Sequence, residues 1–427
     1  MIRILDPNKL GAEAVLARRE DAPDVSAQVA DILAAVRWEG DTAVQRYCAA
    51  FDGMPEGTAL EVPMEELFAA CDAVEPEFLE ILQEAAENIR AFHKRQVREG
   101  FVVSEQNGVV LGQKVTPLAR VGLYVPGGTA SYPSTVLMDC IPAKLAGVRE
   151  VIMATPAKGG KIAPELLAAA AVAGVDRVFR IGGAQAVAAL AYGTKHVPRV
   201  DKIVGPGNVY VAEAKRQVFG LVDIDMIAGP SEILILADGT CNARFVAADL
   251  LSQAEHDANA SAVLVTTSER LAKAVQAELE RQLAQLPRAE IARASIEANG
   301  KIILVPTLAD GISIANEIAP EHLELCVDEP FAYLGQIQNA GSIFLGKYCP
   351  EALGDYFAGP NHTLPTSGTA RFSSPLSVDD FVKKSQFSYY TPEALARVCE
   401  RVACFARKEG LDAHAKSALI RSEEGAE

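Results

Sequence analysis

The sequence lacks the features of membrane-spanning and secreted proteins. Its longest apolar run, residues 166–175, is too short to cross a bilayer. The first residues do not show the basic, apolar and small-residue succession of a signal peptide. None of the 8 cysteines stands in a CxxC pair, so neither a disulfide scaffold nor a cysteine-rich zinc motif is indicated. We expect buried thiols, a cytoplasmic location and no membrane partner.

Positive charge is also scarce. The chain has 40 Lys and Arg against 56 Asp and Glu, which gives a net charge of −16. Such a charge repels a phosphate backbone, so we expect no nucleic-acid partner. A chain of 427 residues with 49% hydrophobic residues exceeds what one core usually organises, so we expect two or more domains.

The periodicity of apolar residues changes along the chain. Up to about residue 105 it is mostly helical, with apolar residues three and four apart in 25–36 and 76–97. From about residue 117, short β-rich runs are each followed by a Gly or Pro turn and then by an alanine-rich stretch. This alternation predicts parallel sheets that are covered by helices on both faces.

The β-rich runs fall into two series, which predict two α/β units. The strands are expected at 120–125, 150–154, 177–181 and 201–204, and then at 233–237, 261–266, 301–305, 323–327 and 342–345. A helix with a leucine stripe is expected over 268–286. Residues 346–377 are rich in Gly, Pro and Ser, which indicates a long functional loop, and a helical tail is expected from about Val378.

Three glycine-containing turns follow predicted strands. They read LYVPGGTA at 123–130, RIGGAQA at 180–186 and KIVGPGN at 202–208. In a doubly wound sheet such turns share the carboxyl edge, where glycines let the backbone approach a phosphate and helix N–H groups bind it. A dinucleotide fits this pattern, although each such turn alone is also common as a connection between a strand and a helix in α/β proteins. Because GxGxxG is absent, the usual ribose-binding acid is not identified.

Polar residues with metal-binding chemistry gather in the second half of the chain. Gln253 and His256 are three apart at the end of a predicted helix, so their side chains share a face. Asp355 and His362 lie in the predicted loop, and His414 lies in the tail. Imidazole, carboxylate and amide oxygen together can bind zinc. The spacing matches neither HExxH nor a zinc finger, so structural or exposed histidines remain an alternative.

Glu321 and His322 are adjacent and follow a proline. Histidine titrates near neutral pH, and a neighbouring carboxylate can act as a second base. This pair is therefore the best candidate for proton transfer. The alternative is an ordinary surface pair at the start of a strand.

Several longer runs resemble one enzyme family. They are IDMIAGPSE at 224–232, LLSQAEHD at 250–257, APEHLEL at 319–325, LGDYFAGPNHTLPT at 353–366 and KEGLDAHA at 408–415. Together with YVPGG, IGGAQA and VGPGN, they resemble the histidinol dehydrogenases in the same order and over essentially the whole chain.

The resemblance implies an α/β fold with two Rossmann-like doubly wound domains, a helical N-terminal segment and a C-terminal dimerisation tail. One domain, split between 22–123 and 233–375, would carry the catalytic and metal site. The inserted domain, 124–232, would bind NAD. The terminal segments 1–21 and 376–427 would make dimer contacts.

The resemblance also implies an activity. Members oxidise L-histidinol through L-histidinal to L-histidine in histidine biosynthesis, with two NAD and with zinc, as homodimers that share their active sites. Glu321 and His322 would be catalytic, and Tyr124, Gln185 and Asn208 would contact NAD. Zinc would be held by Gln253, His256, Asp355 and His414. The residues expected to bind substrate are Ser231, Gln253, His256, His322, Asp355, Glu409 and His414, with His362 as a neighbour.

Other functions remain open on the sequence alone. The nearest is a dehydrogenase of the same family that acts on another amino alcohol or diol, because motifs fix the reaction better than the substrate pocket. A zinc hydrolase would leave the three glycine turns without a purpose. A non-catalytic metal-binding protein would not be expected to pair Glu321 with His322 beside a set of ligands. No cysteine lies in a matched catalytic motif, so a covalent thiol step is not required.

Overall fold

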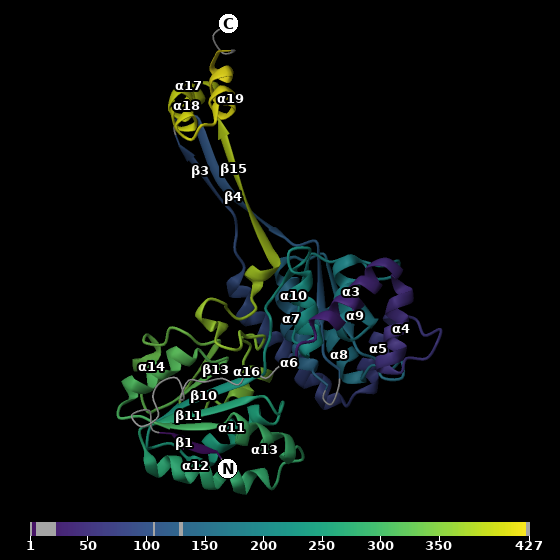
Figure 1. Ribbon diagram of the computed structural model, residues 1–427, viewed down its shortest axis with the longest axis vertical. Helices are drawn as coiled ribbons and strands as arrows, with labels where there is room; N and C mark the ends of the chain where they lie inside the picture. The colour runs from purple at the N-terminus through teal and green to yellow at the C-terminus, as the bar shows by residue number, and fades with distance from the viewer. Residues whose placement is uncertain (1, 6–22, 106, 128–130, 424–427) are drawn as a thin grey trace. The chain divides into compact units, whose positions relative to one another are not determined.

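The computed structural model describes residues 2–5, 23–105, 107–127 and 131–423 (Figure 1). The chain forms two compact units. The first contains Met1–Gln96 and Leu118–Phe381, and the second contains Val97–Pro117 and Val382–Glu427. Two six-stranded sheets belong to the first unit and a three-stranded sheet belongs to the second. The predicted α/β class with parallel sheets is confirmed.

The first six-stranded sheet, called here the β5 sheet, has the order β2-β7-β6-β5-β8-β9. All neighbours are parallel except β2, which is antiparallel to β7. The strands are β2 (Glu61–Val62), β5 (Arg120–Tyr124), β6 (Glu150–Thr155), β7 (Arg177–Arg180), β8 (Lys202–Val204) and β9 (Asp223–Ile224). The central strands are almost entirely buried, as expected for a sheet with helices on both faces.

Helices cover both faces of the β5 sheet (Figure 1). One face packs against α5 (Met64–Ala73), α6 (Pro76–His93), α7 (Pro133–Ala146) and α8 (Pro164–Ala173). The other packs against α3 (Ser26–Glu39), α4 (Asp41–Asp52), α9 (Gly183–Tyr192) and α10 (Val209–Val218). The helices predicted in 25–36 and 76–97 are thus present as α3 and α6.

The N-terminal helices are grouped differently from the expected boundaries. We expected residues 22–123 to belong with the second series of strands. The apolar faces of α3 and α6 instead complete the two cores of the β5 sheet, and β5 itself is central in it. The reason is the amount of apolar surface: a six-stranded sheet has two broad faces, and α7–α10 alone leave part of each uncovered.

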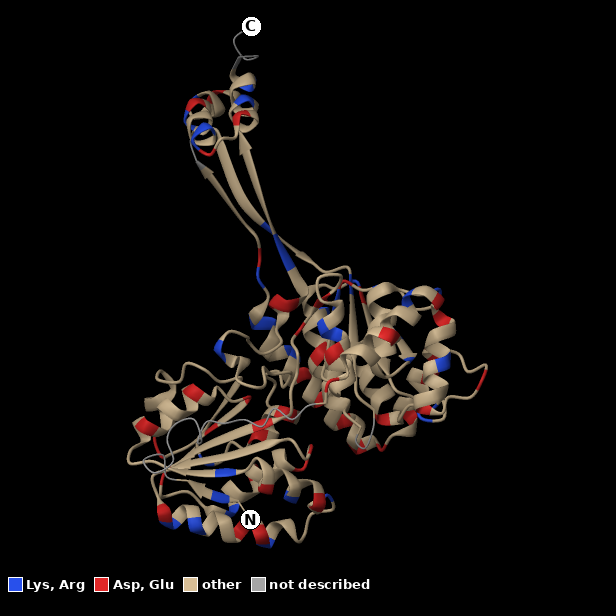
Figure 2. Cartoon of the chain, in the orientation of Figure 1, with Lys and Arg blue, Asp and Glu red and all other residues tan. Residues whose placement is uncertain are grey.

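The second six-stranded sheet, called the β10 sheet, is parallel throughout and has the order β1-β12-β11-β10-β13-β14. Its strands are β1 (Arg3–Leu5), β10 (Glu232–Ala237), β11 (Ser261–Thr266), β12 (Lys301–Leu304), β13 (His322–Cys326) and β14 (Ser342–Leu345). On one face lie α11 (Ala243–Ala254), α12 (Glu269–Leu283) and α13 (Ala289–Ala298); on the other lie α14 (Leu308–Ile318) and α15 (Pro330–Leu334). Both acidic and basic residues lie along α12 (Figure 2).

The second unit is an antiparallel sheet with three helices. Its sheet has the order β15-β4-β3, with β3 (Phe101–Glu105), β4 (Val109–Pro117) and β15 (Val382–Tyr390). The helices are α17 (Pro392–Ala396), α18 (Cys399–Lys408) and α19 (Asp412–Glu423). The prediction of a helical tail from Val378 was therefore wrong for β15. Its aromatic residues favour a strand, and β15 pairs with β4 along its whole length.

The predicted loop at 346–377 contains a short helix, α16 (Glu351–Tyr356). Six residues are too few to show a helical period in the sequence. Turns of 3-10 helix follow at Thr369–Arg371 and Val378–Phe381. Asp355 therefore lies in a helix, α16, and not in a loop.

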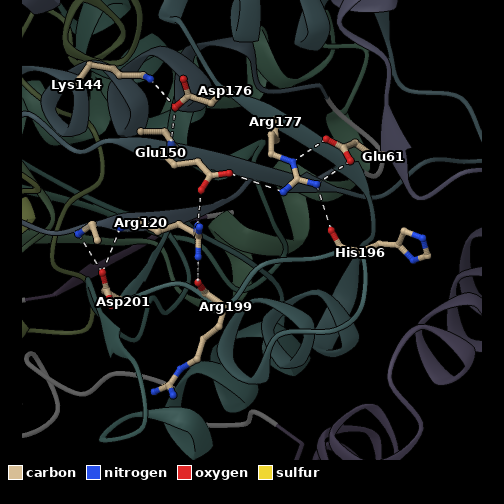
Figure 3. A network of polar contacts seen from close by, with 11 residues as sticks. Glu61, Arg120, Lys144, Glu150, Asp176, Arg177, His196, Arg199 and Asp201 are labelled. Atoms are coloured by element: carbon tan, nitrogen blue, oxygen red, sulfur yellow. Dashed lines mark hydrogen bonds and ion pairs between the residues drawn. The ribbon is translucent and has the colours of Figure 1, made fainter.

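Charged groups join the amino ends of the strands in the β5 sheet (Figure 3). The Arg120 Nε donates to Glu150 at 2.5 Å, between β5 and β6. The Arg177 guanidinium donates to both carboxylate oxygens of Glu61 at 2.7 Å, between β7 and β2. The glycine turns lie at the opposite, carboxyl ends of these strands. We therefore assign this network to holding the sheet together.

The burial of the cysteines and the length of the apolar helices can be compared with what the sequence predicts. Four of the eight cysteines are buried, and Cys404 is exposed. The prediction of buried thiols is therefore wrong for Cys404. Among the described residues, no helix is both long and apolar enough to cross a membrane.

Helix α7 of the β5 sheet contacts the chain that follows α16. The Asn361 amide donates to the carbonyl of Met138 at 2.7 Å, and the Thr363 hydroxyl donates to Asp139 at 2.8 Å. Asp139 is fully buried. Its burial, with the nearby charge of Asp225, raises the pKa of Asp139 from 3.8 to about 8. The contact between the two sheets therefore contains a carboxyl group that favours its neutral form.

This environment predicts a pH-dependent stability. Between about pH 4 and pH 8 the Asp139 carboxyl is ionised in the unfolded chain but protonated in the fold, so its contribution to stability falls as the pH rises. Asp139→Asn keeps an acceptor for Thr363 and removes the titration. The thermal midpoint of the variant should therefore rise relative to the original chain from about pH 5 to about pH 8. Calorimetry over this range tests it, and a pH-independent difference would contradict it.

Candidate functional site

Glu321 and His322 lie where β13 begins beside β10. The two strands are parallel neighbours, with Ile233 opposite His322. The Glu232 N–H donates to Glu321 Oε2 at 2.8 Å, and His322 Nδ1 lies 3.0 Å from the Glu232 carbonyl. A carbonyl oxygen only accepts, so Nδ1 carries the proton. When the imidazole is neutral, its Nε2 is therefore free to accept a proton.

A carboxylate stands between two imidazoles in front of this pair. The Asp355 Oδ1 lies 3.7 Å from His322 Nε2 and 3.7 Å from His362 Nδ1. The other ring nitrogen of His362 lies 3.3 Å from the Thr135 hydroxyl on α7. Two imidazoles and a carboxylate thus meet between the two sheets of the first unit.

Helix α11 brings the next candidates to the same edge. It follows β10 and packs on the sheet, so its last turn returns toward the amino ends of the strands. Gln253 lies in that turn, and His256 follows directly. Burial lowers the pKa of His256, an effect that the Asp355 charge opposes. The imidazole of His256 therefore tends to be neutral, as a metal ligand must be.

The Gln253 side chain has an unusual environment. It is 1% exposed, and within the described ranges neither atom of its amide makes a hydrogen bond. An unpaired buried amide costs free energy. A ligand at this place would satisfy it. An amide oxygen beside imidazole and carboxylate fits a zinc site.

One residue of this region was missed from the sequence. The metal-binding atoms of His322, Glu351 and Asp355 all lie within 4.8 Å of one another. Glu351 begins α16 and stands four residues before Asp355, a spacing that places both side chains on one helical face. Because residues 346–377 are rich in Gly, Pro and Ser, the sequence does not indicate that the spacing of Glu351 and Asp355 is helical.

Burial and charge set the proton affinities of the pair. Burial raises the pKa of Glu321 to about 7, although the His322 charge opposes the rise. Burial lowers the pKa of His322, but the carboxylates of Glu321 and Asp355 outweigh it and raise the pKa overall. Glu321 can therefore exchange a proton close to neutral pH, whereas the neighbouring carboxylates favour the protonated form of His322.

The expected cofactor residues lie at the carboxyl edge of the β5 sheet. Tyr124 ends β5, is 3% exposed, and accepts a hydrogen bond from the Gly183 N–H at 3.1 Å. Gln185 in α9 is buried, and in the described chain its amide makes no hydrogen bond of ordinary geometry. Asn208 caps α10 by accepting from two backbone N–H groups. β5 is the point from which strand order runs both ways, where α/β sheets bind ligands.

The turn after β8 requires glycine at one position. Gly205 has φ +108, and a Cβ there would lie 2.1 Å from the Tyr124 carbonyl. The two turns therefore approach each other closely. Residues 128–130, part of the predicted turn 123–130, lie outside the described residues.

Three further candidates are Ser231, Glu409 and His414. Ser231 is partly buried and precedes β10, next to Glu232. Glu409 follows α18 and His414 lies in α19, so both belong to the second unit, and both are exposed.

Comparison with known proteins gives a consistent result. The family model for histidinol dehydrogenase matches residues 16–422. The histidinol dehydrogenase of Listeria innocua is 56% identical over 96% of this chain and 98% of its own. That of Syntrophotalea carbinolica is 56% identical over 99% of each chain. The crystal structure of histidinol dehydrogenase from Elizabethkingia anophelis has a TM-score of 0.94 at 36% identity, covering 100% of this chain and 99% of the other.

The match spans both six-stranded sheets, the site between them and the second unit. It confirms the resemblance that the motifs indicated. The chain belongs to the histidinol dehydrogenase family.

Proposed function

We propose that the chain oxidises L-histidinol through L-histidinal to L-histidine, with two NAD and with zinc, in cytoplasmic histidine biosynthesis. The observation that carries the proposal is the buried Glu321–His322 pair beside Asp355 and the unpaired Gln253 amide. In the first step an alcohol loses a hydride and a proton to give an aldehyde. In the second, water adds to the aldehyde, and loss of another hydride and proton gives the acid.

His322 takes the proton in the first step. Its Nδ1 is fixed on the Glu232 carbonyl, so the ring presents Nε2 to the substrate hydroxyl. The backbone contact also fixes the orientation of the ring. Proton removal by a positioned base of this kind typically contributes about 10²–10⁴ in rate.

Glu321 activates water in the second step. One of its oxygens is held by the Glu232 N–H, which leaves the other for a water molecule. A carboxyl with a pKa of about 7 is a stronger base than an exposed glutamate, yet a substantial fraction is ionised at neutral pH.

Gln253, His256, Asp355 and His414 would hold zinc, and Ser231 and Glu409 would bind the substrate beside them. Zinc bound there would fix the nitrogens of the amino alcohol and neutralise Asp355, which favours the neutral, proton-accepting form of His322. His362 would line the same site.

NAD would bind at the carboxyl edge of the β5 sheet, where it would accept the hydride. Tyr124, Gln185 and Asn208 would contact it, and the unpaired Gln185 amide supports this placement. We propose that the β5 sheet, with the helices on its two faces, forms a Rossmann-like NAD-binding domain and that 233–375 carries most of the catalytic Rossmann-like domain.

We further propose a homodimer in which the tail 376–427 completes the partner's site. His414 and Glu409 are exposed on the second unit. The same unit exposes many large apolar side chains, which favours a protein partner. They are Val97, Phe101, Val102, Val103, Leu111, Phe387, Tyr389, Tyr390, Val402, Phe405, Leu411 and Ile420.

Activity should depend on the metal. The proposed ligands include no thiolate, so a strong chelator should remove zinc and abolish NADH production from L-histidinol. Zinc added back should restore it. NADH absorbance before and after chelation measures this, and full turnover in protein shown to be metal-free would refute the zinc proposal.

Substitution of Glu321 and substitution of His322 should impair different oxidation steps. Glu321→Gln keeps the shape and loses the base, so oxidation of L-histidinal should fall about 100-fold or more while oxidation of the alcohol falls less. His322→Asn should mainly impair oxidation of the alcohol. NADH formation from each compound supplied alone separates the steps. Equal losses in both steps for both variants would contradict this division.

Two inactive chains should complement each other. Asp355→Ala and His414→Ala each remove one proposed ligand from every site of a homodimer. In a mixed dimer, one site collects both defects and the other is intact, so about half the activity per mixed dimer should return. Co-expression of the two variants with different tags tests it. Purified mixed dimers without activity would show that one chain supplies all ligands.

A further inference from the structure

Glu351 contacts three parts of the site without being one of its expected ligands. It is 2% exposed and begins α16, the helix that carries Asp355. A carboxylate oxygen of Glu351 lies within 4.8 Å of both Asp355 and His322. A buried carboxylate of this kind is costly unless its oxygens have partners, so its contacts indicate its role.

The first contact joins Glu351 to helix α11. The Ser252 hydroxyl donates to Glu351 Oε2 at 2.9 Å. Ser252 immediately precedes Gln253, whose amide makes no hydrogen bond in the described chain. The Glu351 side chain therefore fixes the last turn of α11 against the start of α16.

The second contact joins Glu351 to β13. Its backbone N–H donates to Glu324 Oε1 at 2.8 Å. Glu324 stands two residues after His322 in the strand, so both side chains point to the same side of the sheet. The strand that presents His322 therefore also anchors the start of α16.

The third observation concerns charge. Glu351 and Asp355 are two mostly buried carboxylates within 4.8 Å of each other. Like charges at this distance repel unless a proton or a cation lies near them. In the described chain Glu351 Oε1 makes no hydrogen bond of ordinary geometry. Glu351 thus belongs to the cluster in which the metal-binding atoms of His322, Glu351 and Asp355 lie within 4.8 Å of one another.

We propose that Glu351 is a positioning residue for the metal: it joins α11, α16 and β13 so that Gln253, Asp355 and His322 keep the spacing that zinc requires. The inference rests on the ligand set given under the proposed function. Groups that hold metal ligands in place typically contribute about 10–100-fold to metal affinity.

The test is metal binding by the full-length chain. Zinc affinity of chelator-stripped protein is measured by competition with a fluorescent zinc chelator. Glu351→Ala should weaken zinc binding about 10–100-fold, and Ser252→Ala, which removes the same hydrogen bond from the other side, should weaken it less. Because both remove one contact, the double variant should bind as Glu351→Ala does. Glu329→Ala, an exposed acid in the same sheet region, should bind as the original chain.

Cobalt spectra distinguish a positioning role from direct ligation. Glu351→Gln keeps an acceptor for Ser252, so the visible absorption of the cobalt-loaded chain should keep its wavelength and intensity. A changed spectrum would make Glu351 a ligand and overturn the positioning role. If Glu351→Ala does not fold, Ser252→Ala, at a partly exposed position, still tests the contact.

Asp355→Ala separates this inference from the proposed function. If it abolishes zinc binding while Ser252→Ala and Glu351→Ala bind zinc normally, only the positioning role is wrong. If Asp355→Ala itself binds zinc normally, the proposed ligand set is wrong, and the role of Glu351 is wrong with it.

Discussion

The pairing of β10 with β13 is the constraint on which the rest of the site depends. It places the backbone of Glu232 against both Glu321 and His322, so one residue fixes the Glu321 carboxylate through its N–H and the His322 ring through its carbonyl. Backbone groups in a central strand cannot move without breaking the sheet. The proton-transfer groups are therefore fixed by the most buried part of the fold rather than by a loop.

The site combines opposite edges of two parallel sheets. Ligands usually bind at the carboxyl ends of such strands, and Tyr124, Gln185 and Asn208 lie at those ends in the β5 sheet. The β10 sheet presents the amino ends of β10 and β13 instead, where Glu321 and His322 lie. Helix α11 must then return toward that edge before its last turn can contribute Gln253. The contacts of α7 with Asn361 and Thr363 hold the two edges facing each other.

Much of this could be predicted from the sequence. The central strands of both six-stranded sheets followed from short apolar runs between glycine turns, and the Glu321–His322 pair followed from its chemistry and position. The grouping of α3 and α6 with the β5 sheet could not be predicted, because an amphipathic stripe shows that a helix is buried but not against which sheet. The β15 strand was not predicted because its charged and polar residues interrupt the alternation of apolar and polar positions that is typical of a strand. Its pairing with β4 cannot be read from the sequence. Glu351 was missed because α16 is too short to show a period.

The free amide of Gln253 and the paired carboxylates of Glu351 and Asp355 express the same physical requirement. A folded chain normally gives each buried polar group a partner, because an unpaired group costs about 1–3 kcal/mol and a buried charge costs more. Here the unpaired amide and the crowded carboxylates occur within one small region. Within the described chain the Gln253 amide and Glu351 Oε1 make no hydrogen bond of ordinary geometry, whereas a cation would bind the amide oxygen as a ligand and reduce the repulsion between the carboxylates. Zinc binding and correct local geometry should therefore stabilise each other.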